Sequence, residues 1–165
     1  MKPEIWYDWD NNKNQSVFEN NFYNLHAPDI REDTTMDANM KKRNELLAKT
    51  VIKGLESRNM SGYYAQDKEA ALKQALELIP NGSTIAMGGC MSAHEIGVVI
   101  ALQDGEYNYI DRAKLEPREG LMAAYDADFF LSSANAVTDD GVLVNIDGNS
   151  NRVSCIAQGP KKVIF

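Results

Sequence analysis

The chain has 165 residues, of which 44% are hydrophobic and 25% charged, and its 24 acidic and 17 basic side chains give a net charge of −7. This size suits one domain that buries roughly 70% of its unfolded surface. An acidic chain whose basic residues cluster only at Lys41-Lys42-Arg43 is a poor candidate for nucleic-acid binding. No apolar run approaches the roughly 20 residues of a membrane span.

The first 36 residues differ from the rest, so we predict an aromatic, Asn-rich extension over residues 1–36 and an α/β domain over residues 37–165. The aromatic residues of the extension are Trp6, Trp9, Phe18, Phe22 and Tyr23. They argue against full disorder. A packed segment, a partner-binding arm and a natural start at Met36 are open interpretations. Because the N-terminus lacks the apolar core of a signal peptide, we expect a cytoplasmic protein.

Apolar periodicity predicts alternating helices and strands from residue 37 onward. We expect helices at 37–59, 67–79, 92–103 and 115–125, strands at 62–65, 83–87, 107–110, 128–132, 142–146 and 152–157, and a last apolar run at 162–165. Asp67 is a good N-cap for the second helix. The alternation predicts a three-layer, Rossmann-like, mostly parallel sheet. The strands 142–146 and 152–157, joined by a tight turn, would form a late antiparallel hairpin.

The first candidate site follows strand 83–87. Gly88 and Gly89 let the backbone approach a ligand, and the free N–H groups of the following helix start favour an anion. The segment is neither a Walker loop nor a dinucleotide fingerprint. Ser92 and Glu95 extend this candidate site, although their spacing also fits a capping box that only closes the helix end.

The two cysteines, Cys90 and Cys155, form no CxxC pair and cannot hold an iron–sulfur cluster, which needs four thiolates. With only two histidines as well, we expect no metal site and no cofactor. Cys90 and His94 are conceivable as a nucleophile pair. A half-buried cysteine and a lone solvent-facing histidine explain both residues more simply.

The second candidate site is the polar segment 132–141, which follows strand 128–132. It should therefore lie at a strand's carboxyl end, where α/β proteins bind ligands. The residues that can orient a carboxylate, phosphate or sugar hydroxyl, or let the chain turn around it, are Ser133, Asn135, Thr138, Asp140 and Gly141. Asp139 is the candidate catalytic residue, as a general base or nucleophile. Asp-Asp-Gly is also typical of a turn before a strand.

Arg152 is predicted at the start of a strand, directly after the turn formed by residues 147–151. Its guanidinium can clamp a carboxylate or phosphate with two hydrogen bonds. It can equally pair with Asp147 or Asp139 and fix the turns. Both interpretations remain open at this point.

Three segments, GGCMSAHEIG, SSANAVTDDGVLVNIDG and NRVSCIAQGPKKVIF, together resemble the LUD domain of lactate-utilisation proteins over about Met40 to Phe165. The resemblance implies the fold shared by ribose-phosphate isomerase, glucosamine-phosphate deaminase and CoA transferases. It also implies a cluster-free subunit of a complex that oxidises lactate to pyruvate. Thr138-Asp139-Asp140-Gly141 is similar to the Ser-Glu-Asn-Gly motif of CoA transferases, whose glutamate forms an acyl intermediate. Here Asp139 takes that place and is one methylene shorter.

The leading hypothesis is a protein that binds a small anionic metabolite (a carboxylate, a sugar phosphate or an acyl-CoA) as a subunit in organic-acid metabolism. Its expected partners are subunits of a lactate-utilisation complex or a second copy of the chain. The alternative is a CoA transferase-like or sugar-phosphate isomerase-like enzyme that uses Asp139. A third interpretation is an inactive paralogue kept for its N-terminal arm. The family pattern continues past the last apolar run, so a domain shortened at its C-terminus is also expected.

Overall fold

The structure, a computed structural model, describes residues 38–165. The predicted extension, residues 1–36, lies outside the described residues, so its interpretations stay predictions. The helices are α2 (Ala38–Glu56), α3 (Lys68–Leu78), α4 (Met91–Glu95), α5 (Val98–Asp104), the 3₁₀ helix η1 (Arg112–Lys114), α6 (Pro117–Tyr125) and α7 (Asn151–Gln158). The strands are β1 (Thr84–Met87), β2 (Asn108–Tyr109), β3 (Phe129–Leu131), β4 (Ala136–Val137), β5 (Leu143–Val144) and β6 (Lys162–Ile164).

Four strands form a parallel sheet in the order β2-β1-β3-β6, and β4 pairs with β5 as a separate antiparallel ribbon. In the register of the sheet, Ile85 lies opposite Tyr109 on one side and Phe129 on the other. Three predicted strands and the last apolar run thus join one sheet. The predicted fold class, a Rossmann-like and mostly parallel α/β arrangement, is confirmed.

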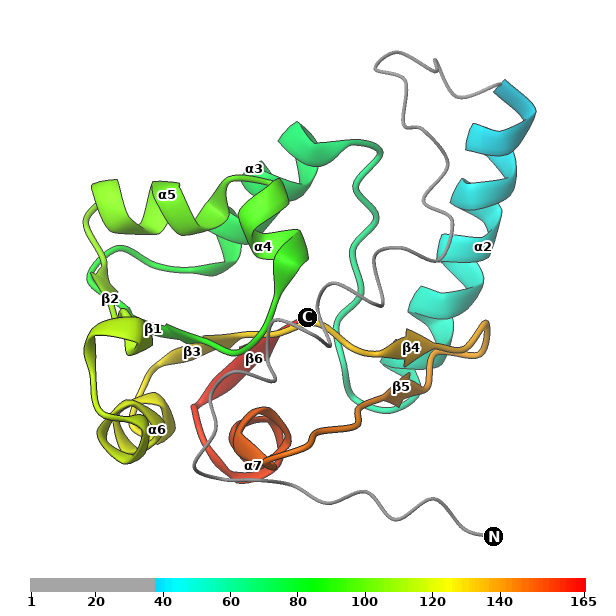
Figure 1. Cartoon of the computed structure of the whole chain (residues 1–165). Helices are drawn as coiled ribbons and strands as arrows, with labels where there is room; N and C mark the ends of the chain where they lie inside the picture. The colour runs from blue at the N-terminus through cyan, green and yellow to red at the C-terminus, as the bar shows by residue number, and fades with distance from the viewer. Residues whose placement is uncertain (1–37) are drawn as a thin grey trace, which may run out of the picture. The chain divides into compact units, whose positions relative to one another are not determined.

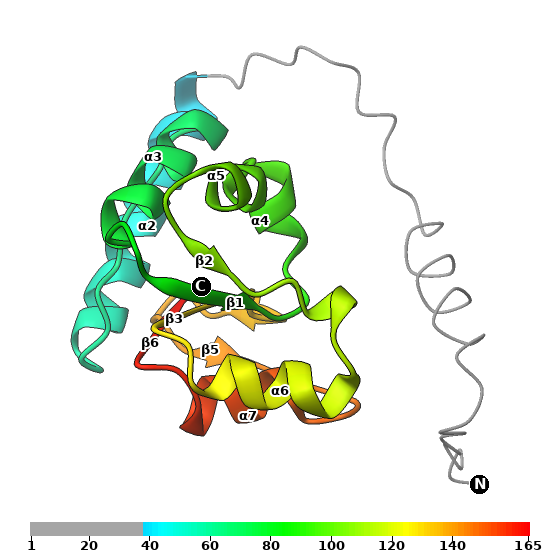
Figure 2. The ribbon, with the colours of Figure 1, turned by 90° about the vertical axis from the view of Figure 1, so that its left-hand side faces the viewer.

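Helices cover both faces of this sheet, with α3, α4 and α5 on one face and α6 and α7 on the other (Figures 1 and 2). Successive side chains of a strand point to opposite faces. Phe129 and Leu131 therefore join one apolar cluster, with Ile85, while Phe130 and Ala86 join a second. The first cluster takes residues of α4 and α5, and the second takes residues of α6 and α7. The two clusters are the two cores of a three-layer structure.

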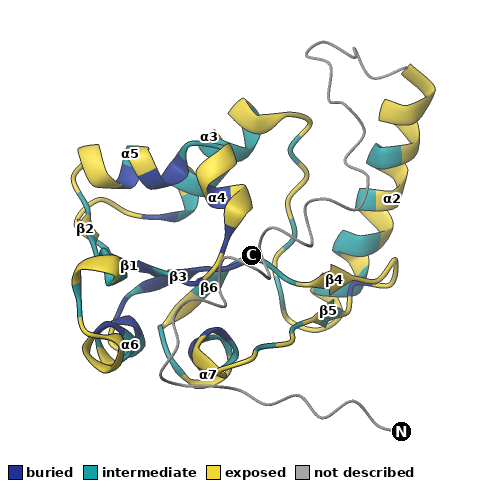
Figure 3. Cartoon of the chain, viewed as in Figure 1, coloured by how far each residue is buried: buried dark blue, intermediate teal, exposed yellow. Residues whose placement is uncertain are grey.

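Burial is deepest at the two central strands, where Ile85, Ala86 and Phe130 are fully buried (Figure 3). Near-continuous apolar sequence is what a parallel strand covered on both faces requires. Helix α2, in contrast, has no buried residue. The central strands β1 and β3 contribute residues to both apolar clusters, and they position the loops that follow them.

The helix predicted over 37–59 is confirmed as α2. This helix contacts the β4–β5 hairpin at two glycines, Gly54 of α2 and Gly141 of the hairpin. A Cβ atom on Gly54 would lie 1.9 Å from the carbonyl oxygen of Asp140. A Cβ on Gly141, whose φ is +80°, would lie 2.7 Å from the carbonyl oxygen of Val51. Nη1 of Arg58 donates to the carbonyl oxygens of Gly54 and Asp140, each at 2.8 Å. Backbone contact this close is possible only because both glycines lack a side chain.

The strand predicted at residues 62–65 is wrong, because this segment has no regular secondary structure. It has no strand partner, and a strand is stabilised by the ladder that it forms with a neighbour. Gly62 instead lies against α2, where an added Cβ would be 2.8 Å from Cγ1 of Ile52. The aromatic residues Tyr63 and Tyr64, which suggested a strand, are exposed.

The helix predicted over 92–103 is two short helices, α4 and α5. Gly97 separates them with a left-handed backbone, φ +79°. A residue in this conformation interrupts the right-handed helix. The capping predicted for the preceding helix is confirmed, since a carboxylate oxygen of Asp67 accepts the N–H of Ala70 at 2.8 Å.

The strand predicted at 152–157 is wrong, because these residues belong to helix α7. The carboxylate of Asp147 accepts the N–H groups of Arg152 and Val153, each at 2.7 Å, and so satisfies two free donors of the first helical turn. Arg152 and Cys155 form the buried side of this helix at a spacing of three residues. The late antiparallel pair is consequently formed by β4 and β5, not by the segments 142–146 and 152–157.

Candidate functional site

The carboxyl ends of β1 and β3 lie side by side at a switch point in the order of the sheet. Strand β1 continues through α4 and α5 to β2 on one side, and β3 continues through α7 to β6 on the other. Connections that leave in opposite directions mark the place where open α/β sheets bind their ligands. We use the name crevice for this place, the edge between the loop after β1 (residues 88–90) and the loop after β3 (residues 132–135). The predicted residues Gly88 and Gly89 follow β1, and Ser133 and Asn135 follow β3.

Direct contacts join the two loops at this edge. The N–H of Gly88 donates to the carbonyl oxygen of Leu131 at 2.9 Å, and Oγ of Ser133 donates to the carbonyl oxygen of Gly89 at 3.3 Å. A Cβ atom on Gly88 would lie 3.0 Å from Cζ of Phe130. A side chain at position 88 would require the ring to shift by a few tenths of an ångström, so the close approach of the ring and the backbone favours glycine.

Backbone donors are available beside these contacts. The N–H groups of Gly89, Met91 and Ser92 have no hydrogen-bond acceptor among residues 38–165. Gly89 and Ser92 are exposed, and nothing lies within 4 Å of the Cβ position of Gly89. The loop after β1 therefore presents unpaired amide donors and open space at the same point, which is the chemistry that an anion requires.

Arg152 is buried at this edge, with 9% of its surface exposed, and its Nε, Nη1 and Nη2 atoms each donate to an acceptor of the protein. Nε donates to Oδ1 of Asp147 at 3.0 Å, and Nη2 donates to Oδ1 of Asn135 and to the carbonyl oxygen of Ile146. Nη1 donates to the carbonyl oxygen of Ser133. Of the two interpretations, pairing with Asp147 is the one that the structure has. The guanidinium thus fixes the loop after β3.

The carboxylate of Asp147 is a strong acceptor because of its partners. Burial alone would raise its pKa, but the hydrogen bonds from the N–H of Val153 and from Arg152 outweigh it, and the pKa lies below its usual value. One carboxylate therefore closes the start of α7 and neutralises the buried guanidinium. Asp147 was absent from the predicted site residues, although its position five residues before Arg152 offered a signal.

The predicted residues Thr138, Asp139, Asp140 and Gly141 form the tip of the β4–β5 hairpin, which contacts α2. Oγ1 of Thr138 donates to the carboxylate of Asp140, and this bond is the main reason that the pKa of Asp140 is lowered. Arg58 adds an ion pair to Asp140 at 3.2 Å. Asp139 is exposed at this tip. This group of residues therefore has the hydrogen bonding of a turn.

The capping box predicted for Ser92 and Glu95 is wrong, because α4 begins one residue earlier, at Met91. Cys90 occupies the N-cap position and makes no side-chain capping bond. Ser92 is exposed within the helix, and Glu95 pairs with Lys68 at 3.7 Å across the surface.

Cys90 and His94 lie in different surroundings. Cys90 is buried, whereas His94 is exposed on α4. No hydrogen bond between them occurs in the described part of the chain. The second thiol, Cys155, is also buried, and burial raises its pKa. A raised pKa keeps a thiol protonated and unreactive.

The structure thus divides the predicted residues into groups. Those at the crevice, linked to one another by contacts, are Gly88, Gly89, Ser133, Asn135 and Arg152. Those on the hairpin tip are Thr138, Asp139, Asp140 and Gly141. Ser92 and Glu95 lie on α4, where the N–H of Ser92 is unpaired but neither side chain is hydrogen-bonded to the crevice residues within the described chain.

One residue at this edge, Arg112, was not among the site residues predicted from the sequence. Arg112, in η1, is half-buried, and its Nη1 donates to the carbonyl oxygen of Met87, the last residue of β1, at 3.4 Å. A signal was present, because Arg112 closely follows the predicted strand 107–110. Charged residues just after a strand of a parallel sheet lie at its carboxyl edge.

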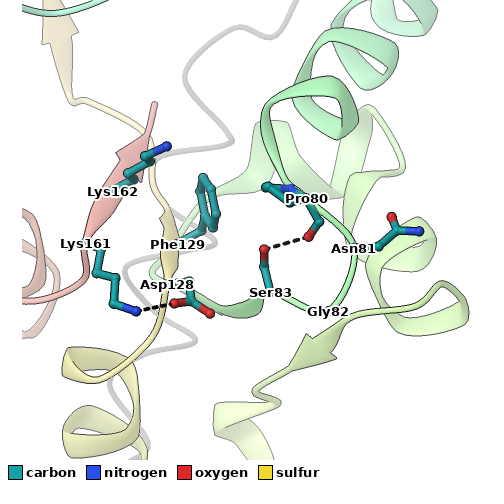
Figure 4. A pocket seen from close by; sticks show the side chains of 8 residues that line it. All are labelled: Pro80, Asn81, Gly82, Ser83, Asp128, Phe129, Lys161 and Lys162. Atoms are coloured by element: carbon teal, nitrogen blue, oxygen red, sulfur yellow. Dashed lines mark hydrogen bonds and ion pairs between the residues drawn. The ribbon is translucent and has the colours of Figure 1, made fainter.

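A hollow of about 380 Å³ lies at the opposite edge of the sheet, near the amino ends of the strands (Figure 4). Two of its charged residues pair with each other, and Nζ of the third, Lys162, lies 5.5 Å from the centre of the Phe129 ring. Nζ of Lys161 donates to Asp128 at 2.7 Å, and Asp128 also accepts the N–H of Thr84 at 2.8 Å. A second hollow, of about 570 Å³, is a shallow surface along α3 lined by Leu72 and Leu76. We favour the crevice over both, because its polar donors lack partners.

None of the described helices combines the length and apolar character needed to cross a membrane. Within residues 38–165, no group of three or more His, Cys, Asp and Glu side chains is placed to hold a metal ion.

An open parallel sheet between two helical layers, with polar loops at the central switch point, defines a Rossmann-like α/β protein. The family model described as LUD domain matches residues 48–165, and the chain belongs to this family. The resemblance inferred from the sequence segments is thereby confirmed. No curated protein and no solved structure matches the chain.

Proposed function

We propose that this LUD-domain protein binds a small anionic metabolite in the crevice between the carboxyl ends of β1 and β3. The observation that carries the proposal is the set of unpaired N–H donors at Gly89, Met91 and Ser92, beside the hydroxyl of Ser133. Backbone amides that converge on open space stabilise a negative charge. The ligand is a carboxylate or phosphate compound.

The family relationship supports organic acids as the substrate class. Members of the family are related to lactate utilisation, and lactate and its oxidation product are both small carboxylates. We propose that the chain works in the cytoplasm as a cluster-free subunit beside redox-active partners. Its own two cysteines are buried and too few for an iron–sulfur cluster.

The test is a thermal-shift screen of the full chain against small carboxylates, sugar phosphates and acyl-CoAs, because a ligand that binds only the native state raises the melting temperature. Gly89→Leu is the informative variant. Its side chain enters open space, so we expect unchanged stability without ligand and no ligand-induced shift. Ser61→Leu, at an exposed position outside the crevice, is the matched control and should respond like wild type. Absence of any stabilising compound would contradict the proposal.

A second candidate function is acyl or sugar-phosphate chemistry at Asp139. One observation favours it: the carboxylate of Asp139 is exposed and accepts no hydrogen bond from the described residues. Incubation with an acyl-CoA followed by peptide mass mapping tests this function. A mass shift on Asp139 that is absent in Asp139→Asn would support an acyl intermediate, and an unmodified peptide with no turnover would rule against it.

A further inference from the structure

Among residues 38–165, Arg112 has no acidic partner, although it is half-buried in a chain with a net charge of −7. Its one hydrogen bond in the described chain, from Nη1 to the carbonyl oxygen of Met87, is long at 3.4 Å. A guanidinium has five N–H donors. Most of its donors are therefore unused by residues 38–165, and a charge removed from water without a partner is costly.

The nearest acidic residue in the sequence is already engaged. Oδ1 of Asp111 accepts the N–H of Ala113 at 3.2 Å and closes the start of η1, while Oδ2 pairs with Lys114 at 3.1 Å. The contrast with Arg152 is clear, since that side chain is paired with Asp147 and surrounded by acceptors. Among residues 38–165, Arg112 is thus a partly buried arginine that forms no ion pair, unlike Arg152.

The position of Arg112 connects it to the crevice. Met87, whose carbonyl it contacts, is followed directly by Gly88 and Gly89, the loop that carries the unpaired amides. Strand β2 precedes η1 in the chain, so Arg112 reaches the carboxyl end of β1 from the neighbouring strand. An unpaired backbone donor and a guanidinium therefore both lie at the carboxyl end of β1.

We infer that Arg112 is the cationic residue of the crevice and binds the oxyanion group of the ligand. This inference rests on the proposed function and deepens it. The planar guanidinium can donate two parallel hydrogen bonds to two oxygens of a carboxylate or phosphate. The unpaired N–H of Gly89 is a further donor in the same loop region. Arg152, which the sequence suggested for this role, instead holds the loop after β3 in place.

The experiment uses the full chain with Arg112→Met, Arg112→Lys and the control Arg118→Met. Methionine retains the aliphatic stem, which lies near Gly120, and Arg118 is an exposed arginine of α6. The probes are sodium lactate and inorganic phosphate at constant ionic strength, followed by calorimetric titration. The two probes separate a carboxylate ligand from a phosphate ligand. Melting temperatures without probe report on any structural role.

We expect wild type and Arg118→Met to bind one probe equally. Arg112→Met should lose roughly tenfold or more in affinity, with Arg112→Lys between them, since lysine keeps the charge without the fork. Without probe, Arg112→Met should melt at or above the wild-type temperature, because it removes an uncompensated charge. Wild-type affinity in Arg112→Met would overturn the inference and leave the proposed function standing. A large loss of stability without probe would assign Arg112 a structural role and also overturn it. Failure of wild type to bind either probe would overturn the inference together with the proposed oxyanion site.

Discussion

The guanidinium of Arg152 and the carboxylate of Asp147 are 3.0 Å apart between Nε and Oδ1, and each side chain is only 11% exposed. The same carboxylate accepts two backbone N–H groups at the start of α7. The same guanidinium donates to the loop that follows β3. One buried ion pair therefore links helix α7 to the loop that borders the crevice.

Removal of Arg152 should strongly destabilise the protein. Arg152→Ala leaves the carboxylate of Asp147 buried without its charged partner, and loss of one member of a buried pair costs about 3–5 kcal/mol. Urea unfolding measures this change. Arg118→Ala, at an exposed site, is the control and should change the free energy of unfolding by no more than about 0.5 kcal/mol. Equal effects of the two variants would show that the buried pair contributes nothing.

Asp147 should also make the free energy of unfolding depend on pH in the acidic range. Its pKa in the folded protein is lowered, whereas an unfolded aspartate titrates near pH 4. Its contribution is therefore complete above about pH 4 and is lost as the pH falls through the lower folded value. Unfolding free energies measured from pH 7 to pH 2 should show the gap between wild type and Asp147→Asn narrowing in this acidic range. A gap that is constant over the whole range would contradict the assignment.

Gly54 offers a test in which local and tertiary effects have opposite signs. In an isolated helix, Gly→Ala stabilises by up to about 1 kcal/mol. Here the new methyl group would collide with the carbonyl oxygen of Asp140, so Gly54→Ala should instead destabilise by about 1–3 kcal/mol. Gly89→Ala, which meets open space, should be nearly neutral. A more stable Gly54→Ala variant would mean that α2 does not pack on the hairpin through this contact.

Local sequence signals explain what could be predicted of the fold. The apolar runs of β1 and β3 and the N-cap at Asp67 depend on neighbouring residues alone, and all three are confirmed. Helix α7 was missed because its start is closed by Asp147, several residues upstream, while the alternating Val153 and Cys155 imitated a strand. Short-range patterns cannot record such a contact.

The candidate site also has one part that could be predicted from local sequence and another part that depends on tertiary contacts. Gly88 and Ser133 were predictable, because residues that follow parallel strands gather at one edge whatever the loop details. For Arg152 the sequence offered Asp147 as one possible partner, but it did not indicate the contact with Asn135, which is distant in sequence. The position of Arg112 after strand 107–110 was visible in the sequence, but its lack of an acidic partner among residues 38–165 is a property of the three-dimensional structure.

Asn135 provides a last test of the loop after β3. Its Oδ1 accepts Nη2 of Arg152 and the N–H of Ile146, the latter at 2.9 Å. Asn135→Ala removes an acceptor from a charged donor and should cost about 1–2 kcal/mol, a value at the low end for such bonds because residue 135 is exposed. Asn135→Asp retains an acceptor oxygen and adds a charge beside the guanidinium, so at pH 7 it should be no less stable than wild type. If both variants lost the same stability in urea unfolding, the acceptor role of Oδ1 would be excluded. If Asn135→Ala alone lost stability, the two bonds that Oδ1 accepts, from Arg152 and from the N–H of Ile146, would be established as contacts that hold this side of the crevice.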